Sequence, residues 1–172
     1  MALTVLSQQR EEAVAVDRAA AYWAVNRNRK CRMKILVAAD GSSYTKRMLA
    51  YVAAHDEWLG AHHDYTVFCG VLAVPHAAAA FVDKATVKGY YDSEAEAVFK
   101  PIRSFFKKQG IEASFVAKIG HPADMIAKLA ESGKFDLVMM GSHGHGLFGN
   151  LVLGSVATKV LANCKTPVLL VR

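Results

Sequence analysis

The sequence lacks the features that mark membrane, secreted and disordered proteins. No stretch reaches the roughly 18 consecutive apolar residues of a membrane span. The three cysteines are odd in number and form no C-x-x-C pair, so neither a disulfide framework nor a cysteine-based metal motif is expected. Charged residues make up 21% of the chain and hydrophobic residues 53%, which excludes a disordered chain. We therefore expect a folded cytoplasmic protein with reduced cysteines.

Acidic residues are missing from the last part of the chain, and lysine is missing from its glycine-rich segment. Residues 137–172 contain no Asp or Glu. Residues 149–155 read G-x-x-x-x-G-S, where a P-loop requires a Lys before the Ser or Thr. Residues 144–149 satisfy G-x-G-x-x-G. Dinucleotide sites place an acidic residue about 20 residues later, and this sequence has none there. Such a segment can hold a phosphate, yet it has no obvious means of cleaving one.

The net charge of +6 owes much to one short basic run within residues 27–32. The remainder is only mildly basic, so no nucleic-acid partner is expected. Residues 1–32 are interpreted as an N-terminal extension, for which three possibilities stay open. They form a helix that packs on the domain or a partner, they form a flexible arm, or they lie upstream of a true start at Met33. Residues 33–172 are long enough for one domain with a full core.

Strand-like and helix-like patterns alternate through this domain. Apolar runs predict five strands, at residues 33–39, 65–74, 111–119, 135–140 and 168–171. Helices are expected after a Ser42 or Ser43 cap, after a capping box at Ser93 and Glu96, and from Pro122 and Gly154. Residues 76–92 are expected to form a long connection, and Pro101 is expected to kink the second helix or delay its start.

This alternation predicts an α/β fold: a doubly wound five-stranded parallel sheet flanked by helices, Rossmann-like or flavodoxin-like. The first and fourth strands are expected to be neighbours at the switch point, where open α/β sheets bind ligands. Asp40 follows the first strand, and the glycine-rich residues 141–155 follow the fourth. A carboxylate for hydroxyl and amine donors, beside backbone amides for phosphate, suits a mononucleotide. The alternatives are that Asp40 only caps a turn and that the glycines only make a tight connection.

The spacing of the glycines resembles that of the universal stress protein family. The family signature is G-x-x-G, nine residues, then G-S/T, and here it is Gly141 to Gly144, nine residues, then Gly154 and Ser155. The strand that ends at Asp40 and the closing residues 166–171 are also similar to the family. The resemblance covers residues 33–172 and leaves out the first 32.

The resemblance implies binding of ATP or AMP, with Mg²⁺ as an optional companion that Ser155 could assist. It implies phosphate and ribose contacts from the glycines and Ser155, an adenosine contact from Asp40, and an adenine pocket at Ala38 and Leu72. His143 and His145 either contact phosphate when protonated or are exposed loop residues. The predicted cofactor-binding residues are Ala38, Asp40, Leu72, Gly141, His143, Gly144, Gly154, Ser155 and Val156. No catalytic residue and no metal site are predicted.

The resemblance also implies a homodimer through residues 168–171, because an exposed apolar edge strand is otherwise prone to aggregate. Three functions stay open. The first is a cytoplasmic protein that binds adenine nucleotide and acts in stress response, as a regulatory or protective protein without efficient catalysis. The second is a weak ATPase or phosphate-transferring enzyme, which needs a metal ligand and a group that positions water. The third is a homodimeric interaction module that binds no nucleotide. No membrane partner is expected.

Overall fold

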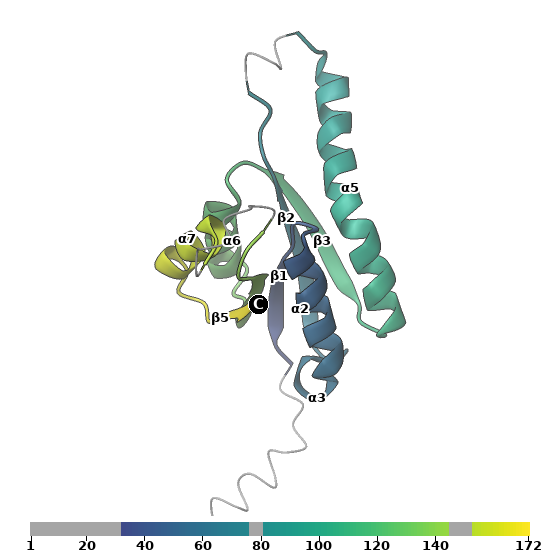
Figure 1. The fold of residues 1–172 in the computed structure, drawn as a ribbon, viewed down its shortest axis with the longest axis vertical. Coiled ribbons are helices and arrows are strands. Elements are labelled where there is room, and N and C mark those ends of the chain that lie inside the picture. Colours follow the sequence, from purple (N-terminus) through teal and green to yellow (C-terminus); the bar gives the residue numbers. More distant parts are fainter. Residues whose placement is uncertain (1–31, 76–80, 145–152) are drawn as a thin grey trace, which may run out of the picture. The chain divides into compact units, whose positions relative to one another are not determined.

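The computed structural model describes residues 32–75, 81–144 and 153–172 (Figure 1). The predicted extension, residues 1–32, therefore lies outside the described residues except for Arg32. The elements in chain order are β1 (Lys34–Ala38), α2 (Ser43–Ala54), α3 (Asp56–Leu59), β2 (Asp64–Val71), α5 (Lys84–Lys108), β3 (Ala113–Ile119), α6 (Pro122–Ser132), β4 (Leu137–Gly141), α7 (Ser155–Asn163) and β5 (Val168–Val171). Within these residues, no helix is both long and apolar enough to cross a bilayer.

The five strands form one parallel sheet in the order β3-β2-β1-β4-β5. The central strand β1 pairs with β2 on one side and β4 on the other, so that Ile35 lies between Tyr65 and Leu137. In chain order, β2 and β3 are added on one side of β1, and the chain then crosses over to add β4 and β5 on the other side. The switch point thus lies between β1 and β4. The predicted doubly wound sheet and the predicted pairing of the first and fourth strands are both confirmed.

Helices cover both faces of the sheet, and the strand residues alternate between two cores. Ile35 and Val37 pack with apolar residues of α2 and α5, whereas Leu36 packs with those of α6 and α7. All three side chains are fully buried. Successive strand residues point to opposite faces, so a strand buried on both faces must be apolar throughout, as β1 is.

The predicted starts of α2 and α6 are confirmed. Ser42 is the N-cap of α2, and its buried hydroxyl accepts a hydrogen bond of 3.4 Å from the Thr45 N–H. Pro122 begins α6, where its missing N–H costs nothing because the first turn has no internal acceptor for it. The Ser42 cap and Pro122 each mark where a helix begins after a strand has ended at the carboxyl edge of the sheet.

The prediction for residues 76–92 and Pro101 is wrong where the structure describes it. Helix α5 begins at Lys84 and runs without interruption past Pro101 (Figure 1). Asp83 caps it by accepting 2.9 Å hydrogen bonds from the N–H groups of Ala85 and Thr86. Pro101 and the residue four positions before it, Ala97, are both exposed. The Ala97 carbonyl that loses its donor therefore lies on the solvent side, where water can replace it. Residues 76–80 lie outside the described residues.

Candidate functional site

A cavity of about 700 Å³ lies at the carboxyl ends of β1, β2 and β4. This volume falls within the range of roughly 300–1,000 Å³ that small-molecule sites occupy. Helix α5 supplies one wall through Tyr90, Glu94 and Val98, while α6 and α7 supply others. The cavity is therefore at the switch point, the place where an open α/β sheet binds its ligand.

All nine residues that the sequence nominated line this cavity. They come from the ends of β1 and β4, the segment after β2 and the start of α7, and they are Ala38, Asp40, Leu72, Gly141, His143, Gly144, Gly154, Ser155 and Val156. The sheet topology thus brings the two predicted halves of the site together. His145, by contrast, lies outside the described residues.

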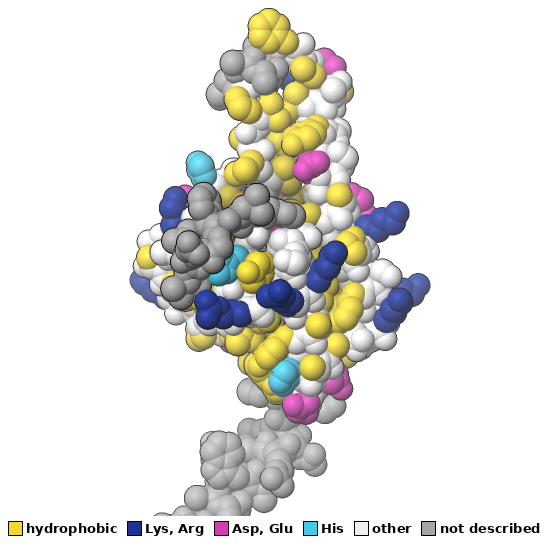
Figure 2. Space-filling view, viewed as in Figure 1, with side chains coloured by type: hydrophobic (Ala, Val, Ile, Leu, Met, Phe, Trp, Pro, Cys, Tyr) yellow, Lys and Arg dark blue, Asp and Glu magenta, His cyan; other side chains and the backbone are white. Residues whose placement is uncertain are grey.

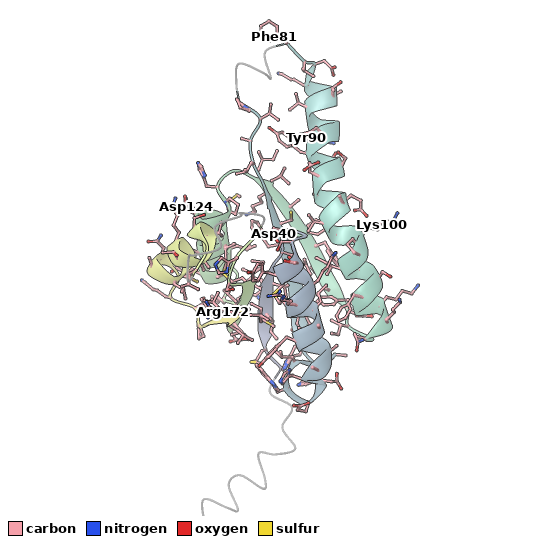
Figure 3. All side chains as sticks on the ribbon, viewed as in Figure 1. Asp40, Phe81, Tyr90, Lys100, Asp124 and Arg172 are labelled. Atoms are coloured by element: carbon pink, nitrogen blue, oxygen red, sulfur yellow. The ribbon has the colours of Figure 1, made fainter. Side chains whose placement is uncertain are left out.

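Asp40 both organises the turn after β1 and faces the cavity. Its Oδ1 accepts hydrogen bonds from the Ser42 N–H at 3.0 Å and from the Thr45 hydroxyl at 2.9 Å. Its own N–H donates to Thr45 Oγ1 at 3.2 Å. A Cβ placed on Gly144 would overlap with Asp40 Oδ2, which puts the second carboxylate oxygen against Gly144. Figure 3 labels Asp40 near the start of α2. The two interpretations of Asp40, turn residue and cavity residue, are therefore compatible.

The signature glycines permit close approach between segments of backbone. A Cβ on Gly141 would lie 2.6 Å from Tyr44 Cβ, and one on Gly154 would lie 3.2 Å from His143 Cα. The Gly154 N–H already donates to the Ser142 carbonyl at 2.8 Å, and the Ser142 N–H donates to the Val171 carbonyl at 2.9 Å. These two amides are thus committed to the fold, and a ligand must use other N–H groups.

The start of α7 presents such groups. Gly154 is the N-cap, it has no side chain to satisfy the first N–H groups, and the first turn contains no acid. Ser155, Val156 and Ala157 line the cavity, and so does Lys159 one turn further along. Unpaired amides, the positive end of the helix dipole and a nearby ammonium group all favour an anion here.

His143 lies in a row of aromatic and charged groups beside the cavity. Its Nδ1 is 3.1 Å from Ser142 Oγ, and its ring centroid is 5.1 Å from that of Tyr44. The Arg47 guanidinium stands 5.1 Å from the centre of the Tyr44 ring. This packing gives the imidazole a defined position at the cavity wall.

Several lining residues were missed from the sequence. Tyr90, Glu94 and Val98 lie four residues apart on one face of α5, a spacing that identifies a shared helix face. Only Tyr90 falls within residues 76–92, which were expected to form a loop, so its place on the same helix face as Glu94 and Val98 was missed. Tyr90 and Leu72 both line the cavity and are 47% and 65% exposed, so they lie at its solvent-facing rim. Figure 2 shows hydrophobic side chains along the upper part of the molecule, where α5 begins.

Cys69 is a buried part of the cavity wall. Burial raises the pKa of its thiol to about 11, and the negative charges of Asp40 and Glu94 add to this effect. The thiol is therefore neutral at physiological pH, and it acts as a small apolar group rather than as a nucleophile. Within the described parts of the chain, no three His, Cys, Asp or Glu side chains are grouped to hold a metal ion.

Comparison with known proteins agrees with this architecture. The model of the universal stress protein family matches residues 32–172. The chain is 34% identical over 142 residues to a Thermus aquaticus relative, "Universal stress protein in QAH/OAS sulfhydrylase 3'region", and the match covers 80% of this chain and 97% of the relative.

Two solved structures are similar as well. The protein MJ0577, a universal stress protein of Methanocaldococcus jannaschii, superposes with a TM-score of 0.66 at 25% identity, covering 81% of this chain and 94% of that one. The universal stress protein from Archaeoglobus fulgidus in complex with dAMP superposes with a TM-score of 0.54 at 21% identity, covering 81% and 98%. Because the family match spans the whole described sheet and its helices, this chain belongs to the universal stress protein family.

Proposed function

We propose that the cavity binds an adenine nucleotide, AMP or ATP, and that the protein acts in stress response as a regulatory or protective nucleotide-binding protein. The observation that carries this proposal is the meeting of Asp40 and the glycine-rich segment at one cavity. Asp40 supplies an acceptor for hydroxyl or amine donors. The start of α7 supplies donors for phosphate.

The apolar lining supports a nucleobase between these two polar ends. Ala38, Val71 and Leu72 line the cavity at the ends of β1 and β2. Such a lining removes the faces of a planar ring from water, while a few polar groups set its orientation. We assign the adenine to this side, Asp40 to the adenosine, and the phosphate to Gly144, Ser155 and Val156.

Proteins of the same fold provide independent support for the class of ligand. Universal stress proteins with TM-scores of 0.54–0.58 and identities of 12–21% to this chain were solved with cAMP, with AMP and with dAMP. Their fold accommodates adenine nucleotides, and this is the class that we propose here.

The lining favours binding over catalysis. Phosphoryl-transfer enzymes use a Lys and a metal held by acids to neutralise the transferred group. The glycine-rich segment lacks the P-loop Lys, and Ser155 is the only hydroxyl that we assign near the phosphate and an optional Mg²⁺. A weak ATPase remains the second candidate. Release of ADP at about 1 per second or faster, the low end of ordinary enzymes, would favour it.

We further infer the organisation of the chain. Residues 33–172 are the nucleotide-binding domain and residues 1–32 are an extension, in a cytoplasmic homodimer that pairs through β5. Strand β5 is the edge of the sheet next to β4, and its apolar residues are only partly buried apart from Val171. Sedimentation should give twice the chain mass of 18.7 kDa, whereas a monomer at all concentrations would contradict the dimer.

The test of nucleotide binding has two steps. Protein purified without added ligand is denatured, and the supernatant is analysed for released adenine nucleotide. The emptied protein is then titrated with AMP and ATP by calorimetry. We expect saturable binding with one site per chain. No heat with either nucleotide at millimolar concentration, together with no released nucleotide, would leave the third candidate, an interaction module without nucleotide.

A further inference from the structure

The cavity passes over the carboxyl edge of the sheet, so it has lining residues on both faces. Ala39 and Cys69 belong to the core that α2 and α5 cover, whereas Phe68, Met140 and Ala157 belong to the core that α6 and α7 cover. All five line the cavity. The contacts proposed for the nucleotide extend from the ends of β1 and β2 to the start of α7, and none of them comes from α5. The part of the cavity next to α5 is therefore left for another ligand.

We call this part the α5 compartment and define it by lining residues that the nucleotide contacts do not use, which are Ala39, Cys69, Tyr90, Glu94 and Val98. The three from α5 follow one another at intervals of four residues, so they share a face of the helix. Val98 closes the inner end, because a Cβ on Gly41 would lie 3.3 Å from Val98 Cγ2. Tyr90 lies at the solvent-facing end, in the first half of α5 (Figure 3). The compartment thus has an apolar floor and, one helical turn apart, a carboxylate and an aromatic ring nearer to solvent.

The charge at the α5 compartment is negative. Glu94 is its carboxylate, and the sole Lys or Arg among the described lining residues of the cavity is Lys159, which belongs to α7 on the other face of the sheet. Burial raises the pKa of the Cys69 thiol to about 11, with smaller contributions from the charges of Asp40 and Glu94. Negative charge therefore acts as far as the floor of the compartment, and it favours a cation over an anion there.

We propose that the α5 compartment binds an organic ammonium ion with a small apolar body. The Glu94 carboxylate accepts hydrogen bonds from the ammonium group. The Tyr90 ring, one turn away on the same helix face, attracts the same cation through its π face. The apolar body packs on Ala39, Cys69 and Val98, with the neutral thiol acting as a small apolar group. The inference goes beyond the proposed function and does not rest on it, because it uses none of the nucleotide contacts.

The test is an amide NMR titration of the full chain at neutral pH with three probes that share a phenyl group. Phenethylamine is a cation under these conditions, phenethyl alcohol is its neutral analogue, and phenylacetate is an anion. We expect phenethylamine to bind with a Kd in the millimolar range, about tenfold tighter than phenethyl alcohol, which is the combined effect of an exposed ion pair and a cation–π contact. Phenylacetate should bind most weakly. The largest shift changes should fall on Ala39, Cys69 and Val98.

Variants of α5 separate the two polar contributions. Glu94→Gln should lower the preference for phenethylamine over phenethyl alcohol by about threefold. Tyr90→Leu should weaken phenethylamine binding by about threefold, whereas Tyr90→Phe keeps a ring face and should bind as the wild type does. Asp92→Asn is the control, because it removes a carboxylate from the same exposed stretch of α5 outside the lining, and it should change neither quantity. Thermal melts of the four variants establish that they fold.

The outcomes that overturn the proposal are specific. Equal affinities for phenethylamine and phenethyl alcohol, or a preference that survives Glu94→Gln unchanged, would show that the compartment does not recognise the ammonium group. Shift changes centred away from Ala39, Cys69 and Val98, or none with phenethylamine at high millimolar concentration, would show that the compartment is not a binding site. A separate titration with AMP tests the proposed function, so a failure of AMP leaves the ammonium site standing on its own result.

Discussion

The α-carbon of Gly144 lies directly against the carboxylate of Asp40, so that a side chain at position 144 would overlap with Asp40 Oδ2. Gly144 is not among the described glycines with φ in the left-handed region, which are Gly41, Gly110 and Gly120. The glycine is therefore required by space rather than by backbone conformation. This contact ties the segment after β4 to the end of β1, and both line the cavity.

The first prediction concerns this contact. Gly144→Ala forces the Asp40 carboxylate or the glycine-rich segment to move. We expect AMP affinity to fall at least about tenfold, and the free energy of unfolding to fall by roughly 1–3 kcal/mol, as for other overpacked sites. Calorimetry and urea denaturation measure the two effects.

Gly89→Ala is the matched control. Gly89 lies within α5, and a Cβ there meets nothing within 4 Å. Alanine should stabilise the helix by about 0.5–1 kcal/mol and leave AMP affinity unchanged. If Gly144→Ala bound AMP as well as Gly89→Ala did, the contact between Gly144 and Asp40 would be irrelevant to the ligand.

The second prediction concerns Cys69. Because its pKa is raised from 9.0 to about 11, the reactive thiolate forms only as the pH rises toward that value. At pH 8 we expect iodoacetamide to label the half-buried Cys164 well before Cys69, and AMP to slow the labelling of Cys69 further. Peptide mapping by mass spectrometry measures both rates. If Cys69 were labelled as fast as Cys164 at pH 8, the Cys69 thiol would not be buried in the cavity wall.

The third prediction concerns the start of α5. Hydrogen bonds from Thr86 and from the Ala85 N–H lower the pKa of Asp83 below its usual 3.8. A depressed carboxyl pKa stabilises the fold above the unfolded value, and this stabilisation is lost as the pH falls through the folded value. Asp83→Ala should therefore lower the melting temperature at pH 7, and the difference from the wild type should shrink below about pH 3.8.

Asp83→Asn keeps a capping acceptor without the charge. Its melting temperature should stay closer to the wild type at pH 7 than that of Asp83→Ala. A difference between wild type and Asp83→Ala that stays constant down to pH 2 would rule out the carboxylate as the source of the cap's stability.

The fourth prediction concerns a buried histidine at the opposite end of the sheet. His63 Nδ1 accepts a 3.0 Å hydrogen bond from the Met33 N–H, which leaves Nε2 to donate to the Trp58 carbonyl at 2.7 Å. His63 is 5% exposed, and His63→Ala removes the imidazole from both hydrogen bonds, with the Met33 N–H and with the Trp58 carbonyl. We expect the free energy of unfolding to fall by about 2–3 kcal/mol.

His63→Asn can retain the acceptor for Met33 but not the donor to Trp58. We expect its free energy of unfolding in urea to fall between those of the wild type and His63→Ala. A His63→Ala variant within about 0.5 kcal/mol of the wild type, the usual scatter for surface changes, would mean that the two hydrogen bonds contribute little.

The sheet and its ligand edge were predictable because their signals are local and strong. Continuous apolar runs such as that in β1 identify strands buried on both faces, and their alternation with helices fixes a parallel order. Once β1 and β4 are neighbours, Asp40 and Gly144 must meet at one edge. The other predicted residues came from the resemblance to the universal stress protein family, and they line the same cavity.

The same reasoning could not predict that α5 forms a wall of the cavity, because the first turns of this helix depend on tertiary contacts. Gly89 weakens the intrinsic helix propensity of this segment. In the structure, the Tyr91 hydroxyl accepts a 2.9 Å hydrogen bond from the Val74 N–H and holds the segment against the chain that follows β2. Tyr90 lines the cavity on the same helix face as Glu94 because α5 already begins at Lys84.

The sequence also could not show which backbone N–H groups are already used in hydrogen bonds within the fold. The Gly154 N–H belongs to a hydrogen bond with the Ser142 carbonyl, although the glycine itself is part of the nucleotide signature. Spacing identifies where the chain comes close to a ligand. It does not identify which N–H groups are still available to one.

The most direct test of the account is an amide NMR titration of the full chain with AMP, because it reports where the ligand binds. We predict that the largest shift changes fall on Ala38, Asp40, Gly144, Ser155 and Val156. Changes should be small at His63 and Trp58, which lie near the amino ends of β1 and β2. Shift changes centred elsewhere, or none at millimolar AMP, would contradict the claim that this cavity is a nucleotide site.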